Sequence, residues 1–353
     1  MRRRVLWPPP ARSPWQIARM SIDSLCTHWL ADHDDDGGGL AVLVIRDGKA
    51  IHKKGYGRTS VEDGRIPDGE TIFDLASLSK HFTATAIMML AERGKLGYDD
   101  PLTTYFPFPA YAQKITVRHL LHHTAGLPDY FALYEADGDD TSRWGEGERP
   151  TSAGVVAALA QEPRPAFAAG KKFDYSNSGY VVLAEIVGKV SGKPFPSFMR
   201  DEVFTPLGMT RTRVNDGSAA PDPNRAVGHE EGEPFEVTPL DDVYGDGAVQ
   251  TTLDDLERWN AAIDANTLVS AATQELAWTR GTLGDGEQTS YGFGWFVSDD
   301  DDARWVNHEG SYGGFTTYYC KEIDRALSVI VLSNFAEAEP DELADAISES
   351  LDA

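Results

Sequence analysis

The sequence is poor in cysteine and in basic residues, and it has no long apolar run. Two cysteines in 353 residues allow at most one internal disulfide, so the chain is not a disulfide-stabilised scaffold. Lysine and arginine number 32 against 56 acidic residues, a formal net charge of −24. This excess of acid makes nucleic acid an unsuitable partner and disfavours anionic membranes. No stretch of about 18 uninterrupted apolar residues occurs, so no membrane-spanning helix is expected.

Several common enzyme motifs are also missing. The sequence contains no GxSxG, GxGxxG or GxxxxGK[ST], which excludes the nucleophile turn of α/β-hydrolases and the usual phosphate-binding loops. His119, His122 and His123 cluster in sequence, but no HExxH pattern or carboxylate companion accompanies them. We therefore expect neither a metal site nor a cofactor.

The first residues do not read as a secretory signal. Three arginines follow Met1, but Pro8 to Pro10 interrupt the apolar segment that a signal needs. We interpret residues 1–20 as a disordered leader and expect a cytoplasmic protein.

Strand patterns occur near both ends of the chain, and helical patterns occur between them. LAVLVIRDGKAIHKKGYG predicts a β-hairpin with its turn at Asp47-Gly48, and four more strand signals follow residue 290. The expected fold class is α/β (α+β): an antiparallel sheet from residues 21–73 and 264–353, flanked by terminal helices. A mainly helical domain, 74–263, is inserted, and the active site is expected in the cleft between the two.

The segment FDLASLSKHFTATAIMMLAERGKLG combines a helix start with two reactive side chains. Asp74 is a suitable N-cap, which would put Ser77 in the first turn. There the free N–H of Ser77 and the helix dipole would stabilise an oxyanion beside its hydroxyl. Lys80 falls on the same face, where burial would lower its pKa enough to accept the serine proton. SxxK alone is a weak motif, and an ordinary helix start is the alternative.

A second motif stands on a glycine-flanked loop before another amphipathic helix. The phenol of Tyr175, held near Lys80, would relay the serine proton to a leaving group. The amide of Asn177 would hold a substrate carbonyl and also bond Lys80.

A third motif lies on a predicted strand near the C-terminus. Strand alternation directs His308 and Gly310 to one face and Glu309 to the other. Gly310 would let a substrate approach the backbone, and the N–H of Ser311 would be a second oxyanion donor.

With SxxK, YxN and HxG in this order, the sequence resembles the serine β-lactamase and penicillin-binding-protein superfamily, in particular class C β-lactamases, DD-peptidases and family VIII esterases. Secondary matches extend through most of residues 38–335: KLGYDDPLTTYFP, ITVRHLLHHTAGLPDY, VFTPLGM, DGAVQTTLDDLERW and SYGFGWF. The resemblance implies a β-lactamase/transpeptidase-like fold and the following roles: Ser77 as the acylated nucleophile, Lys80 and Tyr175 as the base system, and Asn177, His308 and Gly310 as substrate contacts.

One departure from the pattern bears on the substrate. His308 stands where class C β-lactamases carry lysine, and a neutral imidazole is a poorer anchor for a β-lactam carboxylate. We therefore expect a serine hydrolase, an esterase or amidase, that forms an acyl-enzyme with a small ester, amide or peptide substrate. The alternatives are a D-aminopeptidase or DD-carboxypeptidase-like peptidase, a weak β-lactamase, and a sensor or scaffold that is acylated without turnover.

Overall fold

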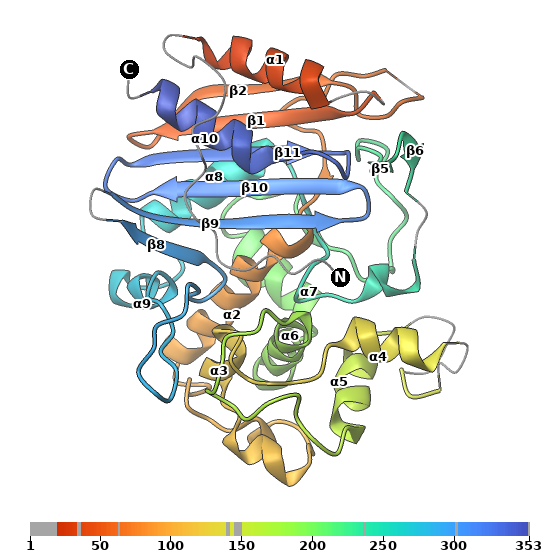
Figure 1. The fold of residues 1–353 in the computed structure, drawn as a ribbon, viewed down its shortest axis with the longest axis vertical. Coiled ribbons are helices and arrows are strands. Elements are labelled where there is room, and N and C mark those ends of the chain that lie inside the picture. The colour runs from red at the N-terminus through yellow and green to blue at the C-terminus, as the bar shows by residue number, and fades with distance from the viewer. Residues whose placement is uncertain are drawn as a thin grey trace.

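The computed structural model describes residues 20–33, 37–62, 64–138, 142–144, 150–235, 238–300 and 303–351. The leader predicted at residues 1–20 therefore lies, apart from Met20, outside the described residues. A six-stranded antiparallel sheet has the order β2-β1-β11-β10-β9-β8 (Figure 1). Its strands are β1 (Gly39–Arg46), β2 (Lys49–Gly57), β8 (Phe296–Asp300), β9 (Ala303–Tyr312), β10 (Phe315–Glu322) and β11 (Leu327–Ser333). The predicted sheet, built from both ends of the chain, is confirmed.

Strand β1 is buried on both faces because its alternate side chains enter two different cores. Leu40, Val42 and Val44 pack into an outer core with Leu25 and Trp29 of the first helix. The intervening Ala41, Leu43 and Ile45 pack into the larger inner core, which contains much of the helical part. The apolar run LAVLVI thus reflects a strand covered on two sides.

Terminal helices cover the outer face of the sheet. Helices α1 (Ile22–His33) and α10 (Pro340–Ser350) contact each other, and α10 packs on β10 and β11. Helix α8 (Leu253–Asp264) lies on the inner face against β1, as Figure 1 shows behind the sheet.

The hairpin turn between β1 and β2 confirms the prediction at Asp47-Gly48. Their φ angles are 51° and 72°, and a tight two-residue hairpin turn requires positive φ at both positions. Glycine adopts this conformation without cost, and aspartate tolerates it better than most residues.

The middle of the chain is mainly helical, as expected. Its longest helices, α2 and α6, pack against each other, and α6 also contacts α3, α5 and α7. The helices are α2 (Lys80–Glu92), α3 (Val117–Leu121), α4 (Tyr130–Asp137), α5 (Ser152–Gln161), α6 (Asn177–Ser191) and α7 (Phe195–Met199). Helix α9 (Ala271–Ala277) comes later, in the segment predicted to belong to the sheet domain. The exact domain boundaries, 74 and 263, stay a prediction.

Short strands join the start of α2 to a distant loop. Strand β3 (Phe73–Asp74) pairs with β7 (Val249–Thr251), which pairs with β4 (Arg213–Val214). A further small hairpin consists of β5 (His229–Glu230) and β6 (Glu233–Pro234). The pairing of β3 with β7 brings the segment before β7 beside the residues that follow β3.

The predicted N-cap role of Asp74 is wrong. Asp74 lies in β3 and its carboxylate accepts hydrogen bonds from Arg225. A 3₁₀ helix, η1 (Ala76–Ser79), precedes α2, and its N-cap is Leu75, which makes no side-chain cap bond. The pairing of β3 in a sheet therefore replaces the cap that the sequence suggested.

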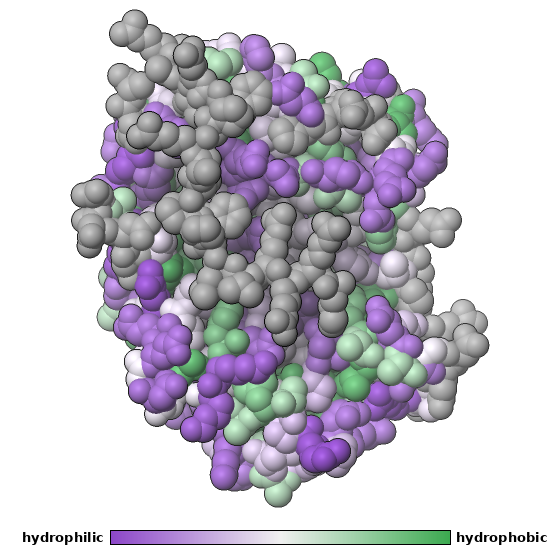
Figure 2. Space-filling view, viewed as in Figure 1, coloured by the Kyte–Doolittle hydropathy of each residue, from purple (hydrophilic) through white to green (hydrophobic). Residues whose placement is uncertain are grey.

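Both cysteines are buried thiols: Cys26 and Cys320 are free and lie in the outer core. None of the helices in the described part of the chain is both long and apolar enough to span a membrane. Figure 2 shows hydrophilic residues spread over both the sheet part and the helical part of the drawn face.

Asn334 joins three backbone segments and is fully buried. Its Oδ1 accepts from the Gly39 N–H at 2.7 Å, and its Nδ2 donates to the carbonyls of Thr59 and Val227 at 3.0 and 2.8 Å. We expect Asn334→Ala to lower the free energy of unfolding by about 3 kcal/mol, because buried backbone groups lose their partners.

Urea denaturation measures this loss, and Asn224→Ala is the matched control. The Asn224 amide also makes two hydrogen bonds, to Glu70 and from Arg65, but both are exposed to water. We expect this control to cost less than about 1 kcal/mol. Equal losses in the two variants would contradict the role of Asn334.

Candidate active site

Ser77 stands at a sharp turn between β3 and α2. The residue before it, Ala76, has a φ of 46°, a conformation that residues with a β-carbon rarely adopt. Leu78 and Ser79 are buried, whereas Ser77 is only half-buried. Its backbone N–H lies in the first turn of η1, where no acceptor inside the helix is available. The turn therefore places both the Ser77 hydroxyl and the Ser77 N–H at a helix start.

Lys80, the first residue of α2, is buried with its amine fully hydrogen-bonded. Its Nζ donates to Ser77 Oγ at 2.9 Å, to Asn177 Oδ1 at 2.8 Å and to the backbone carbonyl of Asp246 at 2.7 Å. The three acceptors come from three separate segments of the chain. An ammonium group has three N–H donors, so the geometry matches it completely.

Burial weakens the proton affinity of this amine. The loss of water around Lys80 lowers its pKa to about 7, although the negative charge of Asp246 raises it. Near neutral pH a substantial fraction of Lys80 is therefore the free amine. In the free-amine form the donor and acceptor of this 2.9 Å hydrogen bond can exchange, so that the Ser77 hydroxyl donates to Lys80 Nζ.

Tyr175 lies in the loop before α6, over the Lys80 amine. The Lys80 Nζ is 4.9 Å from the centre of its ring. Burial raises the pKa of Tyr175 well above its ordinary value, and the side chain of Ser77 opposes the rise. Tyr175 is thus a neutral phenol at physiological pH, next to the Lys80 amine.

Asn177 is placed by the start of α6. The hydroxyl of Ser176, the N-cap, accepts from the Gly179 N–H at 3.2 Å. Such capping satisfies a backbone donor and fixes where the helix begins. The first helical residue, Asn177, then directs its Oδ1 at Lys80.

Strand β9 closes the site on the sheet side. A β-carbon added at Gly310 would lie 2.1 Å from the Leu75 carbonyl oxygen and 2.5 Å from Thr317 Oγ1, so only glycine fits there. Strand β8 pairs with β9 no further than Asn307. The edge of β9 that carries Ser311 therefore continues past the end of β8, next to the Ser77 turn.

His308 is buried and Glu309 is exposed, as the predicted alternation requires. The His308 Nδ1 donates to the carbonyl of Glu309 at 2.6 Å, since a carbonyl only accepts. Its Nε2 then accepts from the Tyr291 hydroxyl at 2.8 Å. Burial, with the nearby Lys80, lowers the pKa of His308 to about 3. The ring is neutral and engaged at both nitrogens.

The structure therefore brings three of the predicted residues, Ser77, Tyr175 and Asn177, around the amine of a fourth, Lys80. His308 lies next to Tyr175, and the centres of their two rings are 6.1 Å apart. Gly310 packs on the turn itself. The contact of His308 with a substrate and the donor role of Ser311 stay predictions.

Two residues at the site had no signal in the sequence. Asp246 occurs in the segment DGAVQTTLDDLERW, and nothing there marks its carboxylate as buried. Tyr130 donates its hydroxyl to Asp246 Oδ2 at 3.0 Å. Only the fold brings these side chains next to Lys80.

The three clustered histidines have separate hydrogen-bond partners. His119 Nδ1 accepts from the Thr116 N–H, His122 Nδ1 donates to the Tyr291 carbonyl, and His123 Nδ1 accepts from the Ser176 N–H. Within the described residues no group of three or more His, Cys, Asp or Glu side chains could hold a metal ion.

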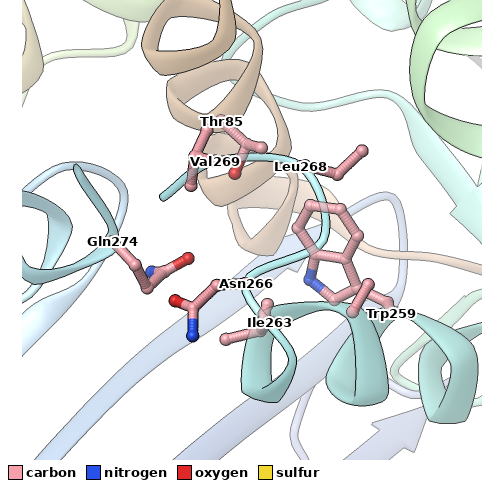
Figure 3. A pocket seen from close by; sticks show the side chains of 8 residues that line it. Thr85, Trp259, Ile263, Asn266, Leu268, Val269 and Gln274 are labelled. Carbon is pink, nitrogen blue, oxygen red and sulfur yellow. The ribbon is translucent and has the colours of Figure 1, made fainter. Parts of the chain in front are cut away.

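A small cavity lies on another side of α2. Figure 3 shows Thr85 of α2, Trp259 and Ile263 of α8 and Gln274 of α9 around it. Its volume of about 10 Å³ has room for a single water molecule. This cavity is too small for a substrate.

Residues 27–352 match the model of the Beta-lactamase family. The chain belongs to this family. The resemblance to serine β-lactamases and penicillin-binding proteins is confirmed, and the family is one of serine-hydrolase-type enzymes.

Curated relatives in the same family include two proteins of Bacillus subtilis (strain 168). Penicillin-binding protein 4* is 34% identical over 313 residues, which cover 84% of this chain and 68% of that protein. The putative penicillin-binding protein PbpX is 28% identical, over 92% of this chain and 76% of its own length.

Solved structures show the same fold. The octameric penicillin-binding protein homologue from Pyrococcus abyssi has a TM-score of 0.79 and 28% identity, covering 94% of this chain and 76% of that one. The D-amino acid amidase from Ochrobactrum anthropi SV3 has a TM-score of 0.77 and covers 94% of this chain and 98% of that one. At 21% identity this second likeness is one of fold.

We expect the His308 ring to stay neutral down to pH 5, because its pKa in the folded protein is about 3. The unfolded chain protonates a histidine at about 6.5. It therefore takes up more protons than the folded protein between these values, and stability falls as the pH drops through this window.

Nitrogen chemical shifts of the histidine rings from pH 8 to 5, with His308→Gln to assign the signal, check this expectation. Urea denaturation at the same pH values should show a weaker pH dependence in His308→Gln. A His308 ring that titrates between pH 6 and 7 would contradict the buried, neutral state.

Proposed function

We propose that the protein is a serine hydrolase that forms an acyl-enzyme at Ser77 and acts on small ester or amide substrates. The observation that carries this proposal is the 2.9 Å contact between Lys80 Nζ and Ser77 Oγ, made by a buried amine whose pKa is about 7. A lysine with an ordinary pKa is a cation at neutral pH and accepts no proton. Here the nucleophile and a working base are already in hydrogen-bond contact.

In the acylation step, Ser77 Oγ attacks the carbonyl carbon of the substrate and its proton passes to Lys80 Nζ. The N–H groups of Ser77 and Ser311 are the proposed donors to the oxyanion. When the tetrahedral intermediate collapses, the C–O or C–N bond to the leaving group breaks. The leaving group takes up the proton that Ser77 lost, through the Tyr175 hydroxyl.

The pKa of Lys80 is lowered and that of Tyr175 is raised, so the two groups have different roles in proton transfer. Tyr175, with its raised pKa, stays protonated at neutral pH. It is therefore a relay that donates one proton while it accepts another. Lys80 is the group that holds the proton between steps. In deacylation the same pair takes a proton from the water that attacks the acyl carbonyl. The bond between the acyl carbon and Ser77 Oγ then breaks, the acid is released, and Ser77 Oγ receives that proton back.

The neutral His308 favours uncharged esters and amides. A β-lactam carries a carboxylate that needs a cation, and His308, with a pKa of about 3, supplies none. The next residue, Glu309, faces the other side of β9, but its negative charge reaches Tyr175 and raises the pKa of that phenol, so this charge also disfavours an anion. These two residues support an esterase or amidase over a β-lactamase.

A second candidate is an amidase or aminopeptidase for D-amino-acid derivatives. The negative charge of Glu309, which acts on Tyr175, favours a substrate with a free amino group, and D-amino acid amidase has a similar fold. A third candidate is a sensor that is acylated at Ser77 but does not hydrolyse the acyl-enzyme.

Replacement of Ser77 by alanine tests the nucleophile. We expect Ser77→Ala to lower the hydrolysis of p-nitrophenyl acetate by ~10³-fold or more, since no acyl-enzyme forms. Intact-mass spectrometry should show one fluorophosphonate adduct in the parent and none in this variant. Ser218→Ala, at an exposed serine, is the control and should react like the parent. Hydrolysis at the parental rate in Ser77→Ala would refute the assignment.

A substrate panel separates the candidates. With short p-nitrophenyl esters, D-alanyl amides and a chromogenic cephalosporin, we expect kcat/KM to fall in that order, because the site offers no cation for a carboxylate. Preference for D-alanyl amides would favour the second candidate. Cephalosporin turnover as the fastest reaction would contradict the proposed specificity, and a lasting adduct without product would indicate a sensor.

A further inference from the structure

Asp246 is tied to the turn that carries Ser77 and Lys80. Its own carbonyl accepts from Lys80 Nζ at 2.7 Å, and the carbonyl of the preceding Gly245 accepts from Thr83 Oγ1 at 2.7 Å. Three residues later, the Val249 N–H donates to Ser79 Oγ at 3.0 Å. These bonds hold the backbone of Asp246 in register with the first turn of α2.

Glycine at position 245 is required for this close approach. Its φ is 108°, and an added β-carbon would lie 2.6 Å from the carbonyl oxygen of Tyr180 and 2.6 Å from the side chain of Ala184. The loop therefore packs directly on α6, the helix that also carries Asn177. Asp246 is fixed between α2 and α6.

Asp246 is 6% exposed, and its carboxylate is only partly hydrogen-bonded. Its Oδ2 accepts from Tyr130, and among the described residues Oδ1 has no hydrogen-bond partner. A buried carboxylate is costly unless a cation compensates it. Burial raises the pKa of Asp246, and the positive charge of Lys80 opposes the rise, so Lys80 is the compensating cation.

Tyr130 is itself held by α6. The Tyr130 N–H donates to Ser178 Oγ at 2.9 Å, and this hydroxyl donates to the Pro128 carbonyl at 2.6 Å. Ser178 follows Asn177, the residue that bonds Lys80. One helix start thus positions both the partner of the amine and the partner of the carboxylate.

We propose that Asp246 is a positioning residue of this site: its buried carboxylate, anchored by Tyr130, is the counter-charge of Lys80 and sets how readily Lys80 exchanges a proton with Ser77. The inference rests on the proposed function, in which Lys80 is the base. Asp246 takes no proton in the reaction. Its negative charge makes Lys80 a stronger base than burial alone would leave it, so that the amine captures the Ser77 proton at neutral pH.

The other titratable groups around the pair hold one charge state near neutral pH. His123 and His308 face Lys80 with lowered pKa values and stay neutral, and the surrounding phenols have raised pKa values and stay protonated. Two acidic residues, Asp129 and Glu309, also act on this region. The phenols are Tyr175, Tyr180, Tyr130 and Tyr312.

The test is the pH profile of kcat/KM for p-nitrophenyl acetate in Asp246→Asn. The parent should lose activity on the acid side near pH 7, where Lys80 becomes protonated. Without the carboxylate the Lys80 ammonium is less stable, so we expect this limb to move down by about 1 pH unit. The maximal rate should fall by about tenfold, because a weaker base transfers the proton less readily.

Two further variants separate an electrostatic effect from a structural one. Tyr130→Phe removes only the hydrogen bond to Asp246 Oδ2; the carboxylate then protonates more readily, and we expect a smaller shift in the same direction. Glu185→Gln is the matched control. The Glu185 carboxylate accepts from Tyr244 at the same 3.0 Å but has no part in the pKa of Lys80, so its profile should be parental.

An acid limb that stays in place in both Asp246→Asn and Tyr130→Phe, while hydrolysis still depends on Ser77, would overturn this inference and leave the proposed function standing. Hydrolysis that does not depend on Ser77 would instead overturn the function. If Asp246→Asn does not fold, the pH dependence of fluorophosphonate labelling in Tyr130→Phe decides: a limb shifted to lower pH supports the inference, and an unmoved limb overturns it.

Discussion

The burial of one lysine amine is the constraint on which the rest of the site depends. An ammonium removed from water needs all of its donors satisfied, and Lys80 finds its acceptors in the Ser77 turn, at the start of α6 and in the loop before β7. These segments are far apart in sequence, so the helical part and the small sheet must both be formed before the amine is fully bonded. The same burial lowers the pKa of Lys80 to about 7, so stability and reactivity come from one desolvated group.

The six-stranded sheet supports the Ser77 turn because its strand β9 packs closely against that turn. Gly310 brings β9 against the carbonyl of Leu75, and Thr317 of β10 donates its hydroxyl to that same carbonyl at 2.9 Å. Strand β8 ends its pairing with β9 at Asn307, so the edge of β9 beyond this residue is not paired with β8. Strand β9 therefore packs on the Ser77 turn from one side, and α6 bonds Lys80 from the other.

Much of this was predictable because it is encoded locally. The SxxK spacing placed Ser77 and Lys80 on one side of a helix start, the glycine-flanked loop placed Tyr175 before α6, and strand alternation separated His308 from Glu309. What failed was non-local. Asp74 pairs in β3 and bonds Arg225 instead of capping α2, and no pattern in the sequence distinguishes Asp246 from the many exposed acids of this chain. Burial of a polar side chain depends on tertiary neighbours, which periodicity does not report.

Charge is distributed in two different ways in this protein. The chain as a whole carries a net charge of −24, and water and salt screen the part of it that lies on the surface. Inside the site the carboxylate of Asp246 and the amine of Lys80 are both buried, where screening is weak and a single charge has a large effect. The neighbouring His308, with its pKa of about 3, adds no positive charge. In the proposed mechanism, proton transfer at Ser77 therefore depends on this one interior pair, while the surface acids act mainly on solubility and on which charged molecules approach.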